Sequence, residues 1–179
     1  MKRLRRCGST PAPTIFLVYA APTPSCDEEL EEFYMDLEKL YRENHTFFKV
    51  IVGVFNATIL PRRAAEELHI GTHGMEWSEE GERLSECIMS THTIHGNSQF
   101  QKHSHFRWAW ESPGKQFHNG IDHIIVNRKF CLTDFAVVPK FYTESDHRLL
   151  RARFRFSRFS VREERAAKFR KRSPKTVVN

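Results

Sequence analysis

Cysteine is scarce in this sequence, and no two of its 4 cysteines lie close together. This spacing excludes a Cys-x-x-Cys motif, and the low density favours free thiols in a reducing compartment. We therefore expect an intracellular location, nuclear or cytoplasmic. Long apolar runs are also lacking, because none approaches the ~18 residues that a membrane-spanning helix needs. The sequence thus predicts no membrane partner.

The start of the chain has too little continuous apolar sequence for a secretory signal. A basic cluster at residues 2–6 precedes an apolar run at 15–18, which loosely imitates such a signal. The polar, proline-containing residues 9–13 interrupt the apolar region, so we favour a strand there. We expect a disordered basic leader over 1–13, a domain over 14–159 and a basic tail over 160–179.

Charge is distributed unevenly along a chain of globular composition. Hydrophobic residues make up 40% of the 179 residues, which excludes a disordered chain, and the net charge is +6. Residues 148–179 carry twelve Lys and Arg against two acids, so the preceding residues are mildly acidic. A basic C-terminal region favours a polyanionic partner, nucleic acid first. The alternative is a solvated tail that keeps the protein soluble.

Two segments have the apolar period of a helix. In the first, apolar side chains fall on one stripe, with a capping box formed by Ser25 and Glu28. The stripe consists of Leu30, Phe33, Tyr34, Leu37, Leu40 and Tyr41. The second helix is predicted over 78–89, with glutamates near its start.

Strands are predicted over short apolar or alternating runs. These runs are 15–20, 47–55, 106–110, 121–126, 135–138 and 149–156. Gly53 indicates a close backbone approach near the end of the second run. In the last run Arg151, Arg153 and Arg155 alternate with apolar residues, so one face is cationic. We expect a layered α/β fold with a mostly antiparallel sheet backed by helices.

Polar residues that suit phosphate-ester chemistry lie beside the ends of several predicted strands. Asp146 and His147 precede the last strand, Asp122 begins another, and Asn56 follows the run that ends at Phe55. Phosphodiester hydrolysis needs a divalent cation, a base and a donor that stabilises the transition state. A carboxylate behind an imidazole fixes the tautomer of the ring and raises its basicity. Asp146 and His147 share one site only if the backbone turns there.

The ordered motifs resemble the endonuclease/exonuclease/phosphatase superfamily. They are Val18-Tyr19-Ala20, Gly53-Val54-Phe55-Asn56, Trp108-Ala109-Trp110-Glu111-Ser112-Pro113, Ile121-Asp122-His123-Ile124 and Ser145-Asp146-His147-Arg148. They are most similar to the endonuclease domain of non-LTR retrotransposons, which nicks target DNA. The resemblance implies a four-layer sandwich of two facing sheets, of which this chain would have an incomplete version.

The resemblance also implies a role for each site residue. Tyr19 would contact the scissile phosphate, and Asn56 would orient the phosphate or the water. Asp146 would help to bind Mg²⁺, and His147, backed by Asp122, would stabilise the transition state. DNA would be the substrate, and the arginines at 151, 153 and 155 are candidate phosphate contacts.

Two departures from the family pattern predict little or no activity. Val54 stands where the family has an aspartate that acts as base or positions water, and a valine side chain neither accepts a proton nor binds a cation. The family's earlier metal-binding glutamate and its asparagine have no counterpart before Thr14. The alternative to an impaired nuclease is a retrotransposon-derived remnant that binds nucleic acid without cutting it. A phosphatase for a small molecule or lipid headgroup is a third reading.

Three further features suggest interactions, and for two of them an ordinary structural role is favoured. An uncovered apolar sheet face, left where the family has more sheet, would favour self-association. The pairs His92/His95 and His103/His105 resemble zinc ligands, but they have no clear spacing or cysteine partners, so ordinary loop histidines are favoured. Trp108 and Trp110 could stack on bases, but core packing on one strand face is favoured.

Overall fold

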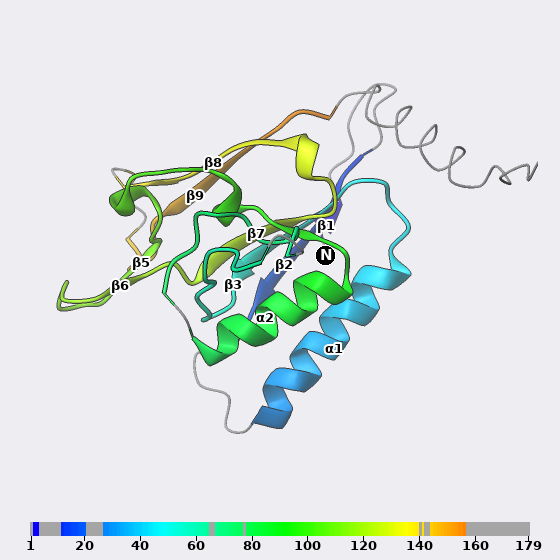
Figure 1. The fold of residues 1–179 in the computed structure, drawn as a ribbon, viewed down its shortest axis with the longest axis horizontal. Coiled ribbons are helices and arrows are strands. Elements are labelled where there is room, and N and C mark those ends of the chain that lie inside the picture. Colours follow the sequence, from blue (N-terminus) through cyan, green and yellow to red (C-terminus); the bar gives the residue numbers. More distant parts are fainter. Residues whose placement is uncertain are drawn as a thin grey trace, which may run out of the picture.

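The computed structural model describes residues 2–3, 12–20, 27–64, 67–76, 78–139, 141 and 144–156. A five-stranded sheet with the order β1-β2-β3-β7-β4 forms the middle layer (Figure 1). Its strands are β1 (Lys2–Arg3), β2 (Thr14–Tyr19), β3 (Lys49–Val54), β7 (Asp122–Val126) and β4 (Ile94–His95). The β2–β3 pairing is parallel and the other pairings are antiparallel, so this sheet is mixed.

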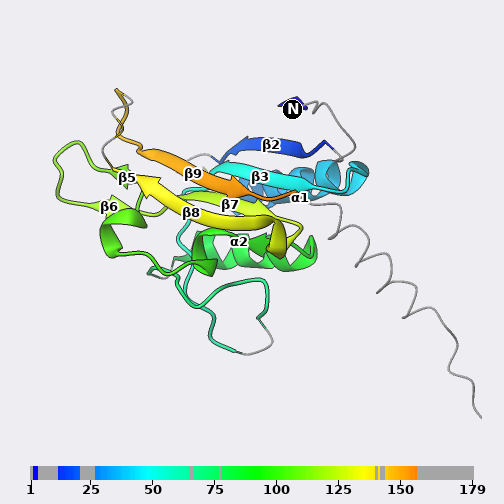
Figure 2. The same ribbon diagram turned by 90° about the horizontal axis from the view of Figure 1, so that it is seen from above.

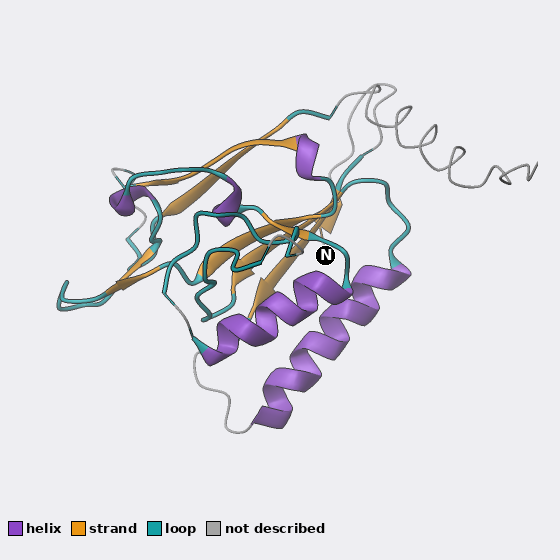
Figure 3. Ribbon diagram, in the orientation of Figure 1, coloured by secondary structure: helices purple, strands orange, loops and turns teal. Residues whose placement is uncertain are grey.

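Two helices cover one face of the central sheet, and a two-stranded ribbon covers the other (Figures 2 and 3). The helices are α1 (Asp27–Glu43) and α2 (Glu79–Ser90), and the ribbon consists of β8 (Leu132–Val138) and β9 (Leu149–Phe154). A separate hairpin pairs β5 (Trp110–Glu111) with β6 (His118–Asn119). Short 3₁₀ helices are η1 (Asn97–Gln99), η2 (Ser104–Phe106) and η3 (Lys129–Cys131). The architecture is therefore layered α/β, as expected.

The helix predictions are confirmed, with one change in the apolar stripe. Leu30, Tyr34, Leu37 and Tyr41 are buried on α1, whereas Leu40 is 57% exposed. At 100° per residue Leu40 lies at the margin of the stripe, which explains its exposure. Ser25 lies outside the described residues. The helix α2 begins after Ser78, whose hydroxyl oxygen accepts the backbone N–H of Gly81. No described helix is long and apolar enough to cross a bilayer.

The β8–β9 ribbon covers β7 and β3, whereas on β2 it packs against Ile15 but leaves Leu17 open. Leu17, Val52 and Ile124 are registered neighbours on the three strands, so their side chains lie on the same face. Ile124 is buried, Val52 is half-buried, and Leu17 is 79% exposed. Burial therefore falls steadily across the sheet towards β2, and an apolar side chain is left in solvent there.

The predicted strand at 106–110 is wrong over most of its length. The backbone N–H groups of Phe106 and Arg107 donate to the carbonyls of His103 and Ser104, which makes a 3₁₀ turn. Trp108 and Ala109 are consecutive and both are buried, so the period-two pattern of a half-buried strand is absent there. Only the β5 segment is a strand.

Two other expectations fall near the chain ends. Within the expected leader, Lys2–Arg3 pairs as a short edge strand with Ile15 and Thr14. Residues 4–11, and the expected tail at 160–179, lie outside the described residues.

The predicted close approach at Gly53 is confirmed, because a Cβ there would overlap the carbonyl oxygen of Val18 on the parallel neighbour.

Candidate functional site

One row of side chains crosses the central sheet where β2 and β3 end and β7 begins. Tyr19 is registered with Val54, and Val54 is registered with Asp122. Registered residues of adjacent strands project to the same face, so the three side chains form one line. The sheet thus brings together two of the expected site residues and the valine that departs from the family pattern.

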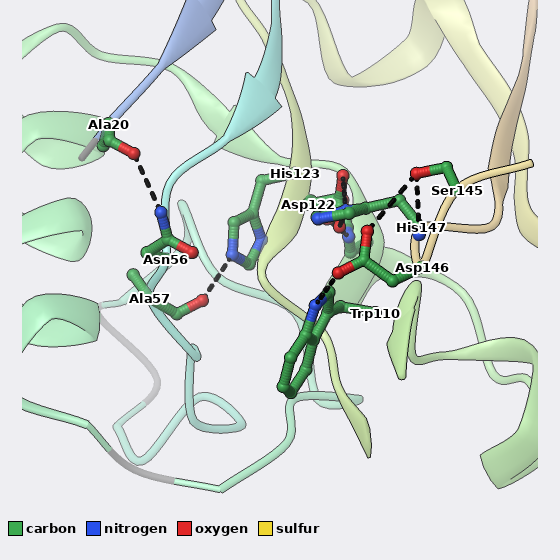
Figure 4. A network of polar contacts seen from close by, with 10 residues as sticks. Ala20, Asn56, Ala57, Trp110, Asp122, His123, Ser145, Asp146 and His147 are labelled. Carbon is green, nitrogen blue, oxygen red and sulfur yellow. Dashed lines mark hydrogen bonds and ion pairs between the residues drawn. The ribbon is translucent and has the colours of Figure 1, made fainter. Parts of the chain in front are cut away.

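Asp122 and His147 form a hydrogen-bonded pair at this edge (Figure 4). The Nδ1 atom of His147 lies 3.0 Å and 3.1 Å from the two carboxylate oxygens of Asp122. The side chains are 12% exposed for Asp122 and 28% exposed for His147. Burial raises the pKa of the Asp122 carboxyl above its ordinary value, and the neighbouring imidazole opposes that rise. Because a carboxylate only accepts, Nδ1 carries the proton and the tautomer of His147 is fixed.

Asp146 lies beside this pair and is held by a tryptophan. The indole Nε1–H of Trp110 donates to the Asp146 carboxylate at 2.8 Å. This hydrogen bond lowers the pKa of Asp146, and the neighbouring imidazole of His147 lowers it further. The negative charge of Asp146 also raises the pKa of Asp122, though less than burial does, so the two carboxylates belong to one electrostatic site.

A turn before β9 brings the consecutive residues Asp146 and His147 to the same place. Glu144 has a left-handed backbone with φ 57°, and the hydroxyl oxygen of Ser145 accepts the backbone N–H of His147 at 3.1 Å. The β5 strand fixes this turn through Glu111 N–H, which donates to the carbonyl of Asp146 at 3.0 Å. The backbone turn that the shared site requires is therefore present.

Asn56 and Tyr19 lie at the ends of the neighbouring strands. Asn56 has φ 49°, and its amide donates to the carbonyl of Ala20 at 2.8 Å, so the amide nitrogen is directed at the end of β2. Figure 4 shows Asn56 just beyond the end of β3 with its amide directed at Ala20, and the ring of His123 directed at Ala57. Tyr19 is 66% exposed. The edge therefore carries all five expected residues, but hydrogen bonds connect only Asp122 to His147 among them.

The carboxylates do not by themselves supply a metal-binding set. Among the described residues, no group of three or more His, Cys, Asp and Glu side chains is placed to hold an ion. Asp122 is engaged by His147, Asp146 accepts from Trp110, and Val54 has no ligand atom. Mg²⁺ prefers several oxygen ligands in an octahedral arrangement. The residues described here do not fit the magnesium site that the resemblance implies, and the candidate histidine pairs do not form a zinc site among them.

Two buried histidines behind the edge were missed by the sequence analysis. The Nε2–H of His123 donates to the carbonyl of Ala57 at 2.8 Å, so its Nδ1 accepts from Nε2–H of His95, also at 2.8 Å. Nδ1 of His95 then accepts from the hydroxyl of Ser98 at 2.9 Å. Burial lowers the pKa of His123 to about 4 and that of His95 well below its usual range, so both rings are neutral near pH 7. Histidines within apolar runs, at positions 95 and 123, were the sequence signal for such a pair.

The arginine row on β9 is confirmed as a cationic face. Arg151, Arg153 and Arg155 are exposed and alternate with the half-buried Ala152, Phe154 and Phe156. Arg151 lies 3.4 Å from the Asp134 carboxylate, and the row points away from the central sheet. These guanidinium groups are available to solvent a few residues after the Asp146–His147 turn.

The fold matches solved nucleases and phosphatases, although no family model and no curated protein matches the sequence. The 3′ phosphatase NExo from Neisseria, bound to a product DNA hairpin, has a TM-score of 0.57 and 18% identity over 81% of this chain and 63% of that chain. The endonuclease domain of TRAS1, a telomere-specific non-LTR retrotransposon, has a TM-score of 0.56 and 11% identity over 86% and 60%. The 3′-5′ exonuclease NExo from Neisseria meningitidis has a TM-score of 0.57 and 17% identity over 78% and 60%.

The chain spans about three-fifths of the length of these structures. The match extends over most of the present sequence and includes a retrotransposon endonuclease domain, the subgroup that the motifs indicated. The structure therefore partly matches the endonuclease/exonuclease/phosphatase fold, over most of this chain and about three-fifths of the solved structures.

Proposed function

We propose that this protein is a nucleic-acid-binding member of the nuclease fold whose phosphodiesterase site is impaired. The observation that carries the proposal is the Asp122–His147 pair, with Asp146 beside it, at the edge where β3 ends and β7 begins. An imidazole held by a carboxylate is suited to donate a hydrogen bond or a proton to a phosphate oxygen. A phosphate ester is thus the ligand class that this edge fits best.

Nucleic acid is the proposed source of that phosphate. The NExo phosphatase that shares the fold is bound to a DNA hairpin, and TRAS1 is a telomere-specific retrotransposon. The exposed arginines of β9 follow the site directly in the chain, and DNA binding draws much of its affinity from such phosphate contacts. DNA is the substrate or ligand we propose, with Tyr19 and Asn56 as its phosphate contacts.

The impairment follows from the position of Val54. Its side chain lies in line with Tyr19 and Asp122, which is where a base or a water-positioning carboxylate would act. A positioned general base is typically worth ~10²–10⁴-fold in rate. With this group replaced by an apolar side chain, and no complete metal-binding set among the described residues, we expect the parent protein to cut very slowly.

A binding protein without catalysis is the alternative, and the cationic face of β9 favours it. Arg151, Arg153 and Arg155 need no intact site in order to contact phosphates. In that case the hydrogen bond between Asp122 and His147 only stabilises the fold. The two proposals differ in whether a restored carboxylate brings back cutting.

The substitution Val54→Asp tests the proposal. Parent and variant are incubated with supercoiled plasmid and Mg²⁺, and nicking is measured by gel electrophoresis. We expect the parent to be nearly silent and the variant to nick, because the new carboxylate stands in the row with Asp122. His147→Ala in the Val54→Asp background is the matched control and should abolish the gain.

Two outcomes would contradict parts of the proposal. Rapid nicking by the parent protein would show that Val54 does not impair the site. If neither the parent nor the variant nicks the plasmid while both still bind DNA, the non-catalytic alternative is favoured.

A further inference from the structure

A groove on the outer side of the β8–β9 ribbon combines cations with aromatic rings. Its volume is about 530 Å³, and it lies between the loop that contains η2 and the outer face of β8 and β9. The groove is lined by Gln101, Lys102, His103, Phe106, Ala136, Val137, Val138, Pro139 and Arg151. It is separate from the Asp122–His147 pair, and the proposed nuclease chemistry makes no use of it.

The cations of this groove surround a single carboxylate. Lys102 Nζ lies 2.7 Å from Asp134, and the guanidinium of Arg151 lies 3.4 Å from the same side chain. Arg153 adds a further positive charge close enough to lower the pKa of Asp134. Three cations around one anion leave a net positive charge, which favours an anionic ligand. The apolar floor at residues 136–139 excludes a purely ionic site.

The η2 loop supplies a set of stacked rings beside these cations. The rings of His103 and His105 are stacked with centroids 5.9 Å apart and planes 20° apart, and the ring of Phe106 lies 3.9 Å from that of His105. Both histidine side chains are exposed. The loop is held in place by the side chain of Arg107, which donates to the carbonyl of Lys102 at 2.7 Å. Exposed ring faces beside cations are the features on which single-stranded bases and their phosphates bind.

The groove is connected through one strand to the sheet edge that carries the Asp122–His147 pair, which we call the acid–histidine edge. His147 and Arg151 are four residues apart, which is ~13 Å along an extended chain. Arg148, between them, donates to the carbonyl of His105 at 3.4 Å, so the start of β9 and the ring-bearing loop are joined. A nucleic-acid strand at the edge could therefore continue into the groove within a few nucleotides.

We propose that this groove binds a single-stranded nucleic-acid segment, with bases stacked on the rings of His103 and Phe106, which line it, and a phosphate on Arg151. The proposal rests on the proposed function only in taking nucleic acid as the ligand. It requires no cutting, and it places the contact on the outer face of the ribbon. A duplex cannot use the rings in this way, because its bases are already stacked on one another.

The test is fluorescence anisotropy of the full chain with a labelled oligothymidylate of about 12 nucleotides, within the usual site size of such surfaces. The titrations are made in EDTA over a salt series. Arg151→Ala should weaken binding and reduce the slope of log affinity against log salt by about 0.7, the value for one single-strand phosphate contact. His103→Ala should weaken binding about tenfold with the slope unchanged, since it removes a ring that lines the groove but leaves the carbonyl that accepts from Phe106.

Lys39→Ala is the charge-matched control, because Lys39 is exposed on α1, across the central sheet from the ribbon. Its affinity and salt slope should change far less than those of Arg151→Ala. Equal losses in the two variants would overturn the proposal in favour of diffuse electrostatic attraction. Failure of the parent to bind the oligonucleotide would also overturn it, as would an equal effect of His103→Ala on a blunt duplex of the same length.

The nuclease and groove proposals fail separately. If Val54→Asp does not nick plasmid but the groove variants lose oligonucleotide affinity as described, the groove proposal is supported and the nuclease proposal is not. If Val54→Asp nicks plasmid and the groove variants bind like the parent, the groove is overturned and the nuclease stands.

Discussion

His123 donates its Nε2–H to the carbonyl oxygen of Ala57, 2.8 Å away and 66 residues earlier in the chain. The acceptor precedes α2, whereas the donor lies directly after Asp122 on β7. This bond therefore ties the segment that follows Asn56 to the strand that carries the site carboxylate. His95 completes the buried chain through its bond to the other nitrogen of His123.

The buried histidines predict an acid-sensitive fold. Burial lowers the pKa of His123 to about 4, and the pKa of His95 is also lowered, while both titrate near 6.5 in the unfolded chain. The unfolded state therefore binds these protons first as pH falls. The contribution of these rings to the free energy of unfolding is fully present above pH 6.5, and it is lost as the pH falls from 6.5 to about 4. For His123 alone the loss is on the order of 3 kcal/mol.

Urea denaturation between pH 7.5 and 4 measures this decline. The variant His45→Gln, at an exposed position, should follow the parent curve. If the parent loses no stability between pH 6.5 and 4.5, the two rings are not held neutral by burial.

Trp110 should control the acidity of Asp146. In Trp110→Phe the carboxylate loses its 2.8 Å indole donor, the largest cause of its lowered pKa, so the pKa of Asp146 should rise towards its ordinary value. Carboxyl-detected NMR titration measures the change. Phe117→Leu, at an exposed position of the same hairpin loop, is the control and should leave the pKa unaltered. An unchanged pKa in Trp110→Phe would show that the indole bond is absent in solution.

Gly53→Ala should disrupt the pairing of β2 with β3. The added methyl group would overlap the backbone of Val18, which has no flexible end that can move away. We expect a loss above ~3 kcal/mol, or failure to fold, from steric strain in a central strand. Thermal unfolding measures the loss. Gly114→Ala is the matched control, because its Cβ would have its nearest neighbour 4.0 Å away on the side chain of Gln116. Equal melting temperatures for the two variants would contradict the close approach.

The open side of β2 should favour self-association. Leu17 is exposed on the face that the ribbon covers elsewhere, next to the exposed Tyr19 on the same face. Removing apolar surface from water is worth about 25 cal/mol per Å², so we expect copies to associate there at high concentration. Light scattering should show association that Leu17→Ser weakens and that Leu40→Ser, on the helix side, does not. Monomeric parent protein at all concentrations would contradict this expectation.

Local periodicity was enough to predict the two helices and the buried strands. The α1 stripe and the apolar run at β3 each repeat with the period of their element, so burial follows from the sequence. The same reasoning failed at 106–110, where aromatic residues alternate but the chain makes a 3₁₀ turn first. Local hydrogen bonds there outweigh a weak strand preference.

The site was predicted in part, because its contacts join distant segments. The Asp122–His147 pair was implied by the ordered motifs, and the structure places the two side chains 3.0 Å apart. The bond between Trp110 and Asp146 spans 36 residues and leaves no local pattern. The bond between His95 and His123 spans 28 residues, although a buried imidazole always needs a partner and each ring lies in an apolar strand. Periodicity locates a face but does not identify such partners.

The β5–β6 hairpin and the Asp146 turn are joined by hydrogen bonds into one structural unit. Backbone bonds join Glu111 to Asp146 and Arg148 to Ala109, and the indole of Trp110 holds the carboxylate between them. A molecule that binds to the protruding hairpin and displaces it would therefore also displace the Asp146 turn.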